Sequence, residues 1–77
     1  MKELLENMVK AIVDSPEDVE VTVNEGEDTL IYELRLGDDD LGKVIGKRGK
    51  NIGAIRTIIF AASAKEGTKR SIIEIIE

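Results

Sequence analysis

The spacing of apolar residues changes three times along these 77 residues, and this succession restricts the folds open to the chain. Apolar side chains first recur at helical spacing with charged ones on the other side, which predicts an amphipathic helix over residues 2–13, ended by Asp14-Ser15-Pro16. Valines then alternate with polar residues over 19–23. The alternation resumes after "NEGED" over 30–36, which predicts a β-hairpin with Gly26 in its turn.

A second helical part and a last strand follow. "GDDD" precedes a short helix expected over 39–45, and we expect Asp38 or Asp39 to cap it, because their carboxylates can accept hydrogen bonds from free N–H groups. A longer helix is predicted from near Lys50 to Gly67. Its expected apolar face consists of Ile52, Ile55, Ile58, Ile59 and Ala62. "RSIIEIIE", residues 70–77, alternates again and predicts a strand that ends the chain.

The order α-β-β-α-α-β predicts an α+β domain with a mixed three-stranded sheet. The first two strands should be antiparallel through their short turn, whereas the two-helix crossover makes the second and third parallel. The strand at 29–36 is then central, and all three helices pack on one face of the sheet. That face is expected to carry Leu30, Tyr32, Leu34, Leu36, Ile73 and Ile75. A chain of this length, 42% hydrophobic, can form one domain with one modest core.

Composition excludes several classes of function. Without cysteine there is no disulfide framework or thiolate metal site. Histidine is absent as well, and the acids are concentrated on segments away from the glycines at 46 and 49, so neither a nucleophile-base pair nor a paired-carboxylate site can be assembled. "GDDD" lacks the spacing of an EF-hand, so no metal or cofactor is expected. The longest apolar run is only a few residues, and the first residues mix acids and bases, unlike a signal peptide or membrane span. We therefore expect a cytoplasmic, non-enzymatic protein.

Positive charge is concentrated in one part of an acidic chain. Residues 43–70 hold eight cations and one acid, a net charge of +7, whereas the remainder holds three cations and fifteen acids, a net charge of −12. The two parts together give the net charge of −5. This asymmetry indicates an anionic partner for the basic segment, and the alternative is a solvated basic helix face.

The glycine-bracketed sequence Gly46-Lys47-Arg48-Gly49 lies in that basic segment, between the two helices. Glycine permits the backbone angles of a sharp corner, and the start of the following helix offers free N–H groups and a favourable dipole for phosphate. A Walker A loop is excluded, because only three residues separate Gly42 from Gly46 and Lys47 is followed by arginine. Leu41 and Ile45 on one helix, with Ile52 and Arg56 on the next, should flank the corner with an apolar strip. Phosphates at the corner and bases on that strip describe single-stranded nucleic acid binding.

The sequence "VIGKRGKNIGAIR", residues 44–56, resembles the I-G-x-x-G-x-x-I signature of KH domains. With its N-terminal α-β extension the order resembles the type II KH fold. Size and pattern over essentially the whole chain are similar to the small stand-alone bacterial KH proteins of the KhpA family. The resemblance implies one KH domain over 1–77, with an extension at 1–24 and a β-α-α-β unit at 29–76. It also implies binding of single-stranded RNA as an RNA chaperone or post-transcriptional regulator.

The resemblance also implies roles for individual residues. The positions that match the phosphate-contacting loop are Gly46, Lys47, Arg48, Gly49 and Lys50. The positions that match the base groove are Leu41, Gly42, Ile45, Ile52 and Arg56, with Arg70 and Ile72 as candidates for its far wall. Val44 and Ile55 match core positions. Gly53 departs from the family pattern, because a glycine inside the second helix costs about 1 kcal/mol relative to alanine.

Several alternatives stay open at this point. Ile45 and Ile52 could be core residues instead. The two aromatic residues, Tyr32 and Phe60, are expected to pack rather than to stack on bases. The preference for RNA over single-stranded DNA rests on the resemblance alone, which also implies a homodimer or a heterodimer with a larger KH-containing protein. The rival function is a protein-interaction module with a degenerate KH fold, which an apolar outer sheet face at Ile31, Ile72 and Ile76 would support.

Overall fold

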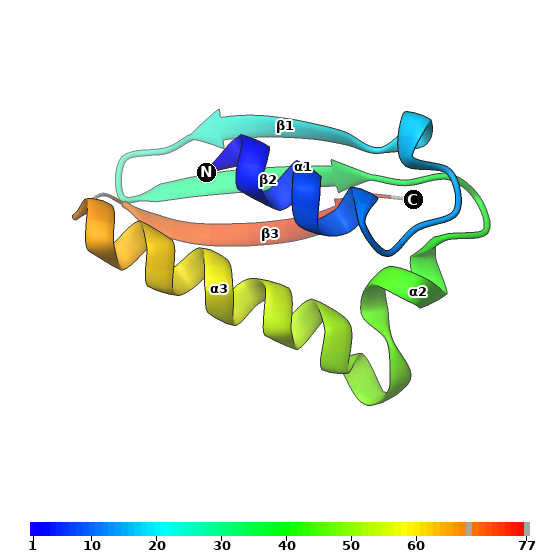
Figure 1. Ribbon diagram of the computed structural model, residues 1–77. Helices are drawn as coiled ribbons and strands as arrows, with labels where there is room; N and C mark the ends of the chain where they lie inside the picture. The colour runs from blue at the N-terminus through cyan, green and yellow to red at the C-terminus, as the bar shows by residue number, and fades with distance from the viewer. Residues whose placement is uncertain (68, 77) are drawn as a thin grey trace.

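The computed structural model describes residues 1–67 and 69–76 and has the expected order of elements (Figure 1). The helices and strands are α1 (Lys2–Lys10), β1 (Glu20–Glu25), β2 (Thr29–Arg35), α2 (Leu41–Ile45), α3 (Lys50–Glu66) and β3 (Arg70–Ile76). Two single-turn 3-10 helices, η1 (Pro16–Asp18) and η2 (Lys47–Gly49), lie before β1 and between α2 and α3. The predicted last residue of the third strand, at position 77, lies outside the described residues.

The sheet has the predicted mixed topology with β2 in the centre. β1 runs antiparallel to β2, with Val23 opposite Tyr32, and β3 runs parallel to β2, with Ile73 opposite Tyr32. Figure 1 shows α1 and α3 on the same side of this sheet. The one-turn α2 packs chiefly against α3, near the end of the sheet where β2 finishes. The predicted one-sided α+β arrangement is therefore confirmed, and α2 joins it through α3.

The core forms between α1, α3 and the covered sheet face. Its buried hydrophobic members are Leu5, Val9, Val21, Tyr32, Leu34, Val44, Ile52, Ile55, Ile59 and Ile73. Leu30, Leu36 and Ile75 pack against this cluster while partly buried, so the sheet face was predicted correctly. The core positions expected at Val44 and Ile55 are also confirmed, at 0% and 6% exposure.

Several element boundaries differ from the sequence prediction. α1 ends at Lys10 rather than 13, because the Ile12 N–H donates to the Val9 carbonyl, three residues back, and the chain then leaves the helix. Ile12 is consequently 39% exposed. β1 is shifted toward the turn, running over 20–25 instead of 19–23, β2 occupies 29–35, and α2 begins at Leu41 rather than 39.

The buried face of α3 is rotated from the predicted one. Ile58 was expected in the core but is 48% exposed, whereas Ile52, Ile55, Ile59 and Ser63 form the buried stripe. The Ser63 hydroxyl is satisfied by a short hydrogen bond with the Ser71 hydroxyl on β3, which lets a polar residue lie against the sheet. α3 ends as predicted at Gly67, which adopts the left-handed conformation with φ of 68°.

The aspartates before α2 do not cap it as expected. The residue preceding the helix is Asp40, and its carboxylate makes no hydrogen bond to the helix N–H groups. Instead the backbone N–H groups of Asp14 and Ser15 donate to its two oxygens, at 3.1 and 3.0 Å. Asp40 is only 2% exposed. This buried carboxylate therefore joins the segment after α1 to the start of α2, 25 residues away.

Candidate nucleic-acid interface

The corner between α2 and α3 has an unusual backbone conformation. α2 stops at Gly46, whose φ is 74°, and α3 starts after Gly49, whose φ is 73°. Between them Arg48 also has a positive φ, 56°, the one non-glycine residue to do so in the described part of the chain. Three positive φ values within four residues reverse the chain in one turn, and the side chains at 47 and 48 are exposed at its tip.

Glycine is required at position 46 for two separate reasons. L side chains rarely adopt its φ, and a Cβ added there would lie 2.7 Å from Cγ and 2.9 Å from the backbone N of Asn51. Gly49 shares the positive φ but has open space around it. The Asn51 side chain is held over the corner because its Nδ2 donates to the Lys43 carbonyl at 2.7 Å. Sequence reasoning missed this residue, because only the tertiary turn of α2 against α3 gives its amide a partner.

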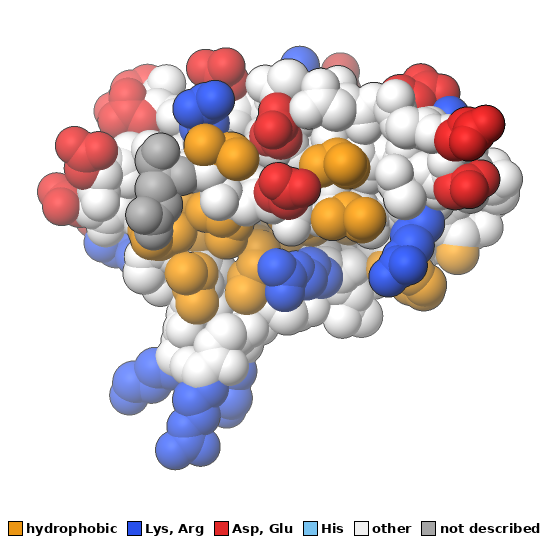
Figure 2. Space-filling model, turned by 180° about the vertical axis from the view of Figure 1, so that it is seen from behind, with side chains coloured by type: hydrophobic (Ala, Val, Ile, Leu, Met, Phe, Trp, Pro, Cys, Tyr) orange, Lys and Arg blue, Asp and Glu red, His pale blue; other side chains and the backbone are white. Residues whose placement is uncertain are grey.

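Three exposed cations, Lys47, Arg48 and Lys50, occupy the corner. Figure 2 shows Lys and Arg side chains gathered on a knob that projects from the body, with acidic side chains along the opposite rim. Lys43, on the preceding helix α2, is engaged elsewhere, since its ammonium lies 2.9 Å from the Asp14 carboxylate. The hydrogen bond and charge of Asp14 raise the pKa of Lys43 above its usual value.

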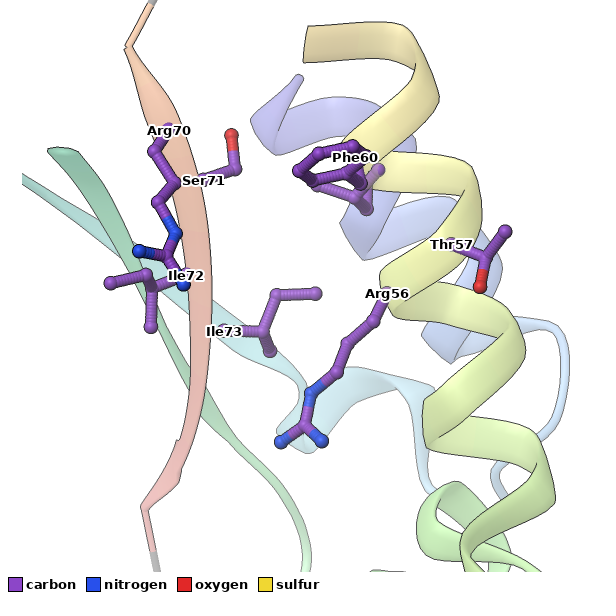
Figure 3. Close-up of a pocket in the computed structure, with 8 residues that line it drawn as sticks. Arg56, Thr57, Phe60, Arg70, Ser71, Ile72 and Ile73 are labelled. Atoms are coloured by element: carbon purple, nitrogen blue, oxygen red, sulfur yellow. The ribbon is translucent and has the colours of Figure 1, made fainter. Parts of the chain in front are cut away.

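A groove of about 440 Å³ lies between α3 and β3. Arg56, Thr57, Ile59 and Phe60 line it from the helix, and Arg70, Ser71, Ile72 and Ile73 line it from the strand. In Figure 3 the Arg56 guanidinium extends into the gap beside Ile73, while Arg70 and Ile72 extend from the other side of β3. Three residues chosen from the sequence, Arg56, Arg70 and Ile72, thus line one groove.

The other expected groove residues lie apart from it. Leu41 lines a separate hollow of about 290 Å³ with Leu36 and Ile76, beyond the ends of the strands. Gly42 is exposed, and Ile45 is partly buried against the core. Ile52 is 6% exposed, the same value as the core residue Ile55, so in this structure it is a core residue, which was the alternative considered.

The two aromatic residues behave differently from one another. Tyr32 packs in the core as expected, with 2% exposure. Phe60 was also expected to pack, but its side chain is 62% exposed on the face of α3 that borders the groove. The helical pattern could not place it, because Ile59 beside it takes the buried position.

The turn of the β-hairpin is hydrogen-bonded to Lys69, the residue before β3. The Lys69 ammonium donates to the Glu25 carboxylate at 2.6 Å and to the Gly26 carbonyl at 2.7 Å. This contact lowers the pKa of Glu25. Lys65 lies in the last turn of α3, where its charge is favourable. Ile31, Ile72 and Ile76, which were expected on an apolar outer face of the sheet, are partly buried.

Within residues 1–67 and 69–76 no group of three acidic side chains is placed to hold a metal ion. None of the described helices has the length and apolar character needed to cross a membrane.

An α-β-β-α-α-β domain whose two middle helices meet at a G-x-x-G corner has the architecture of a KH domain. The family model described as "KhpA/KhpB, KH domain" matches residues 2–75, and the chain belongs to this family.

Relatives match over all or nearly all of their length. The chain is 50% identical over 76 residues to the RNA-binding protein KhpA of Clostridium acetobutylicum, covering 99% of this chain and 100% of that protein. It is 44% identical over 77 residues to the RNA-binding protein KhpA of Chlamydia trachomatis, covering 100% of this chain and 97% of that protein. Among solved structures, Era of Aquifex aeolicus bound to GDP and AlF4⁻ superposes with a TM-score of 0.64 at 16% identity. The match covers 96% of this chain and 30% of Era, and it supports the fold alone.

Proposed function

We propose that the chain binds single-stranded RNA, with backbone phosphates at the glycine corner and bases in the groove between α3 and β3. The observation that carries the proposal is the position of three exposed cations, Lys47, Arg48 and Lys50, at the start of α3, the helix whose later turns form one wall of an apolar-floored groove, in a chain of net charge −5. Phosphate contacts dominate affinity for nucleic acids, and a groove beside them gives unstacked bases a surface. Two relatives that match the whole chain are named RNA-binding proteins.

The proposed phosphate site consists of Gly46, Lys47, Arg48, Gly49 and Lys50. The positive φ values at 46, 48 and 49 turn the backbone sharply. Because the loop has glycine at both ends, no Cβ atom there obstructs the approach of an RNA strand. Because the Lys43 ammonium already forms an ion pair with the Asp14 carboxylate, we assign the phosphate contacts to the cations at positions 47, 48 and 50.

The proposed base surface consists of Arg56, Arg70 and Ile72 in the groove, with Leu41, Gly42 and Ile45 on α2 as further proposed base contacts outside it. Ile52 supports this surface from the core below it. Guanidinium groups can hydrogen-bond base edges or stack on base faces, and the isoleucines Ile59 and Ile73 give the groove an apolar floor.

For the cell we propose that residues 1–77 act as one RNA-binding KH domain in the bacterial cytoplasm, as an RNA chaperone or post-transcriptional regulator and not as an enzyme. RNA is favoured over single-stranded DNA because the relatives carry RNA in their names. Pairing with a second copy or with a larger KH-containing protein is a further part of the proposal, supported by the joint KhpA/KhpB family description.

The test is the double variant Lys47→Asp with Arg48→Asp, titrated against a fluorescein-labelled oligouridine by anisotropy over a range of salt. We expect strongly weakened binding and an unchanged fold, because both side chains are exposed. Each phosphate contact contributes about −0.7 to the slope of log affinity against log salt on single strands, so losing two contacts should flatten the slope by about 1.4.

The matched control is Lys2→Asp with Lys10→Asp, which changes net charge equally but lies on α1, away from the corner. Equal losses in the two double variants would mean that only net charge matters and would refute the phosphate site. A wild type with no RNA affinity would favour the second candidate, a protein-interaction module. The observation behind that candidate is the exposure of adjacent apolar positions on α3, with Ile58 at 48%.

A further inference from the structure

Phe60 is the most exposed large hydrophobic side chain in the described part of the chain. It lies at the junction of two hollows: the groove described above and a second one of about 540 Å³ toward the end of α3. Both hollows are lined by Phe60, Arg70 and Ser71. The groove therefore continues past the proposed base surface, with an aromatic ring where its two parts meet.

The ring is oriented across the groove. Figure 3 shows Phe60 turned from α3 toward β3, opposite Ser71, with Arg56 reaching into the same gap. Arg56 and Phe60 are four residues apart and so share one side of the helix. One face of a planar ligand on the ring would meet Phe60, while the Arg56 guanidinium extends into the same groove and Arg70 borders it from the edge strand β3.

The charge of the surroundings selects the kind of occupant. Among the described residues that line the two hollows there is no acid, whereas Arg56, Lys69 and Arg70 are cationic. Lys69 is already bonded to Glu25, which leaves the two arginines as the cations available to a ligand. An exposed ring in a groove that two arginines line complements a base with its phosphates, because every base has a face that can stack on an aromatic ring.

The distance from the corner is consistent with a continuous strand. Ten residues of α3 separate Lys50 from Phe60, or about 15 Å of helix at 1.5 Å per residue. A stacked strand advances about 3.4 Å per nucleotide, so about four nucleotides would span that distance.

We propose that Phe60 is a stacking platform for a base of single-stranded RNA at the end of the groove farther from the glycine corner, with Arg70 holding an adjacent phosphate. This inference rests on the proposed function and extends it. Stacking on one ring is tolerant of base identity, so Phe60 should raise affinity and lengthen the bound segment without selecting a particular base.

The test compares Phe60→Leu, Phe60→Ala and Phe60→Trp by anisotropy with fluorescein-labelled oligouridine. Leucine keeps an apolar side chain but removes the ring, so Phe60→Leu and Phe60→Ala should each lose about five-fold or more in affinity, while Phe60→Trp should retain it. Ile58→Ala, a change at another exposed apolar residue of α3 two positions away, is the matched control and should bind normally. Urea melts should show all four variants folded, since both side chains are largely exposed.

Phe60→Trp also gives a direct signal, because the chain contains no other tryptophan. Its emission should be quenched by unlabelled oligouridine but not by an oligouridine in which abasic sites replace the bases. Quenching that instead rises with protein concentration, together with a dimer in sedimentation, would show that a second copy of the chain covers the ring and would overturn the proposal.

The two proposals fail in different ways. If Phe60→Leu binds as the wild type does while Lys47→Asp with Arg48→Asp is weakened, the stacking platform is wrong and the phosphate site stands. If the wild type itself does not bind oligouridine, both proposals are refuted together.

Discussion

Replacing Asp40 by alanine should destabilise the domain more than its place in a run of three aspartates suggests. Its carboxylate is 2% exposed and accepts hydrogen bonds from the N–H groups of Asp14 and Ser15 at 3.1 and 3.0 Å. A hydrogen bond to a charged group contributes about 1.5–3 kcal/mol. Since both donors lie near the surface, water can partly replace the lost acceptor, and we take the lower end of the range for each bond.

The expected loss for Asp40→Ala is therefore about 3 kcal/mol, a large part of the 5–15 kcal/mol typical of a folded domain. For a domain of 60–100 residues, each kcal/mol lowers the melting temperature by about 4–8 °C, so the shift should be about 12–24 °C. Urea unfolding followed by circular dichroism would measure the free energy of unfolding. Asp40→Asn should still cost about 1.5 kcal/mol, because an amide offers one acceptor oxygen to two donors.

Asp39→Ala is the matched control for this experiment. Asp39 is the preceding residue in the same run and is exposed, so its loss should change the free energy of unfolding by no more than about 0.5 kcal/mol. If Asp40→Ala were as mild as Asp39→Ala, the two hydrogen bonds would be contributing nothing, and the link between the segment after α1 and the start of α2 would be held by packing alone.

Three further predictions concern the core, the corner and pH. Ile52→Ala should cost about 2–5 kcal/mol in urea melts and Ile58→Ala under about 1 kcal/mol, and equal costs would contradict the observed burial. Gly46→Ala should lower stability by more than about 1 kcal/mol in urea melts and weaken oligouridine binding, and an unchanged stability would contradict the close approach of Asn51. Because Lys69 lowers the pKa of Glu25, the wild type should be more stable than Glu25→Gln at neutral pH. This advantage should disappear as the pH falls through the lowered pKa, and a constant difference between their melting temperatures across a pH series would be evidence against the pairing.

The order of elements and the sheet topology could be predicted because they depend on local patterns. The change from helical to alternating spacing located each helix and strand to within a few residues, and the crossover of two helices required β2 and β3 to be parallel. The sharp corner was also predictable, since Gly46 and Gly49 interrupt the helical pattern twice in four residues. Their positive φ values are consistent with that interpretation.

What the sequence could not supply depends on contacts between distant segments. Asp38 or Asp39 was expected to cap the helix, but the buried aspartate is Asp40, and its partners lie 25 and 26 residues away. The hydrogen bond from the Asn51 amide to the Lys43 carbonyl could not be predicted, because it depends on how α2 packs against α3. The pattern of α3 allowed Ile58 or Ile59 to face the sheet, and a rotation of one position decides which. That same rotation left Phe60 exposed, so the aromatic residue of the candidate site was assigned to the interior.

The parallel pairing of β2 with β3 has a consequence for the kinetics of folding. Residues 29 and 70, which are partners in this ladder, are 41 positions apart, so the entropy of closing a long loop must be lost before any of these hydrogen bonds form. We expect this pairing to limit the folding rate, while the β1–β2 hairpin, with its short turn, can form early. The groove is formed by α3 and β3, so we expect it to be complete only after β3 has paired with β2. A peptide carrying the glycine corner alone would therefore lack the groove. A nascent chain whose β3 segment has not yet left the ribosome would lack it as well.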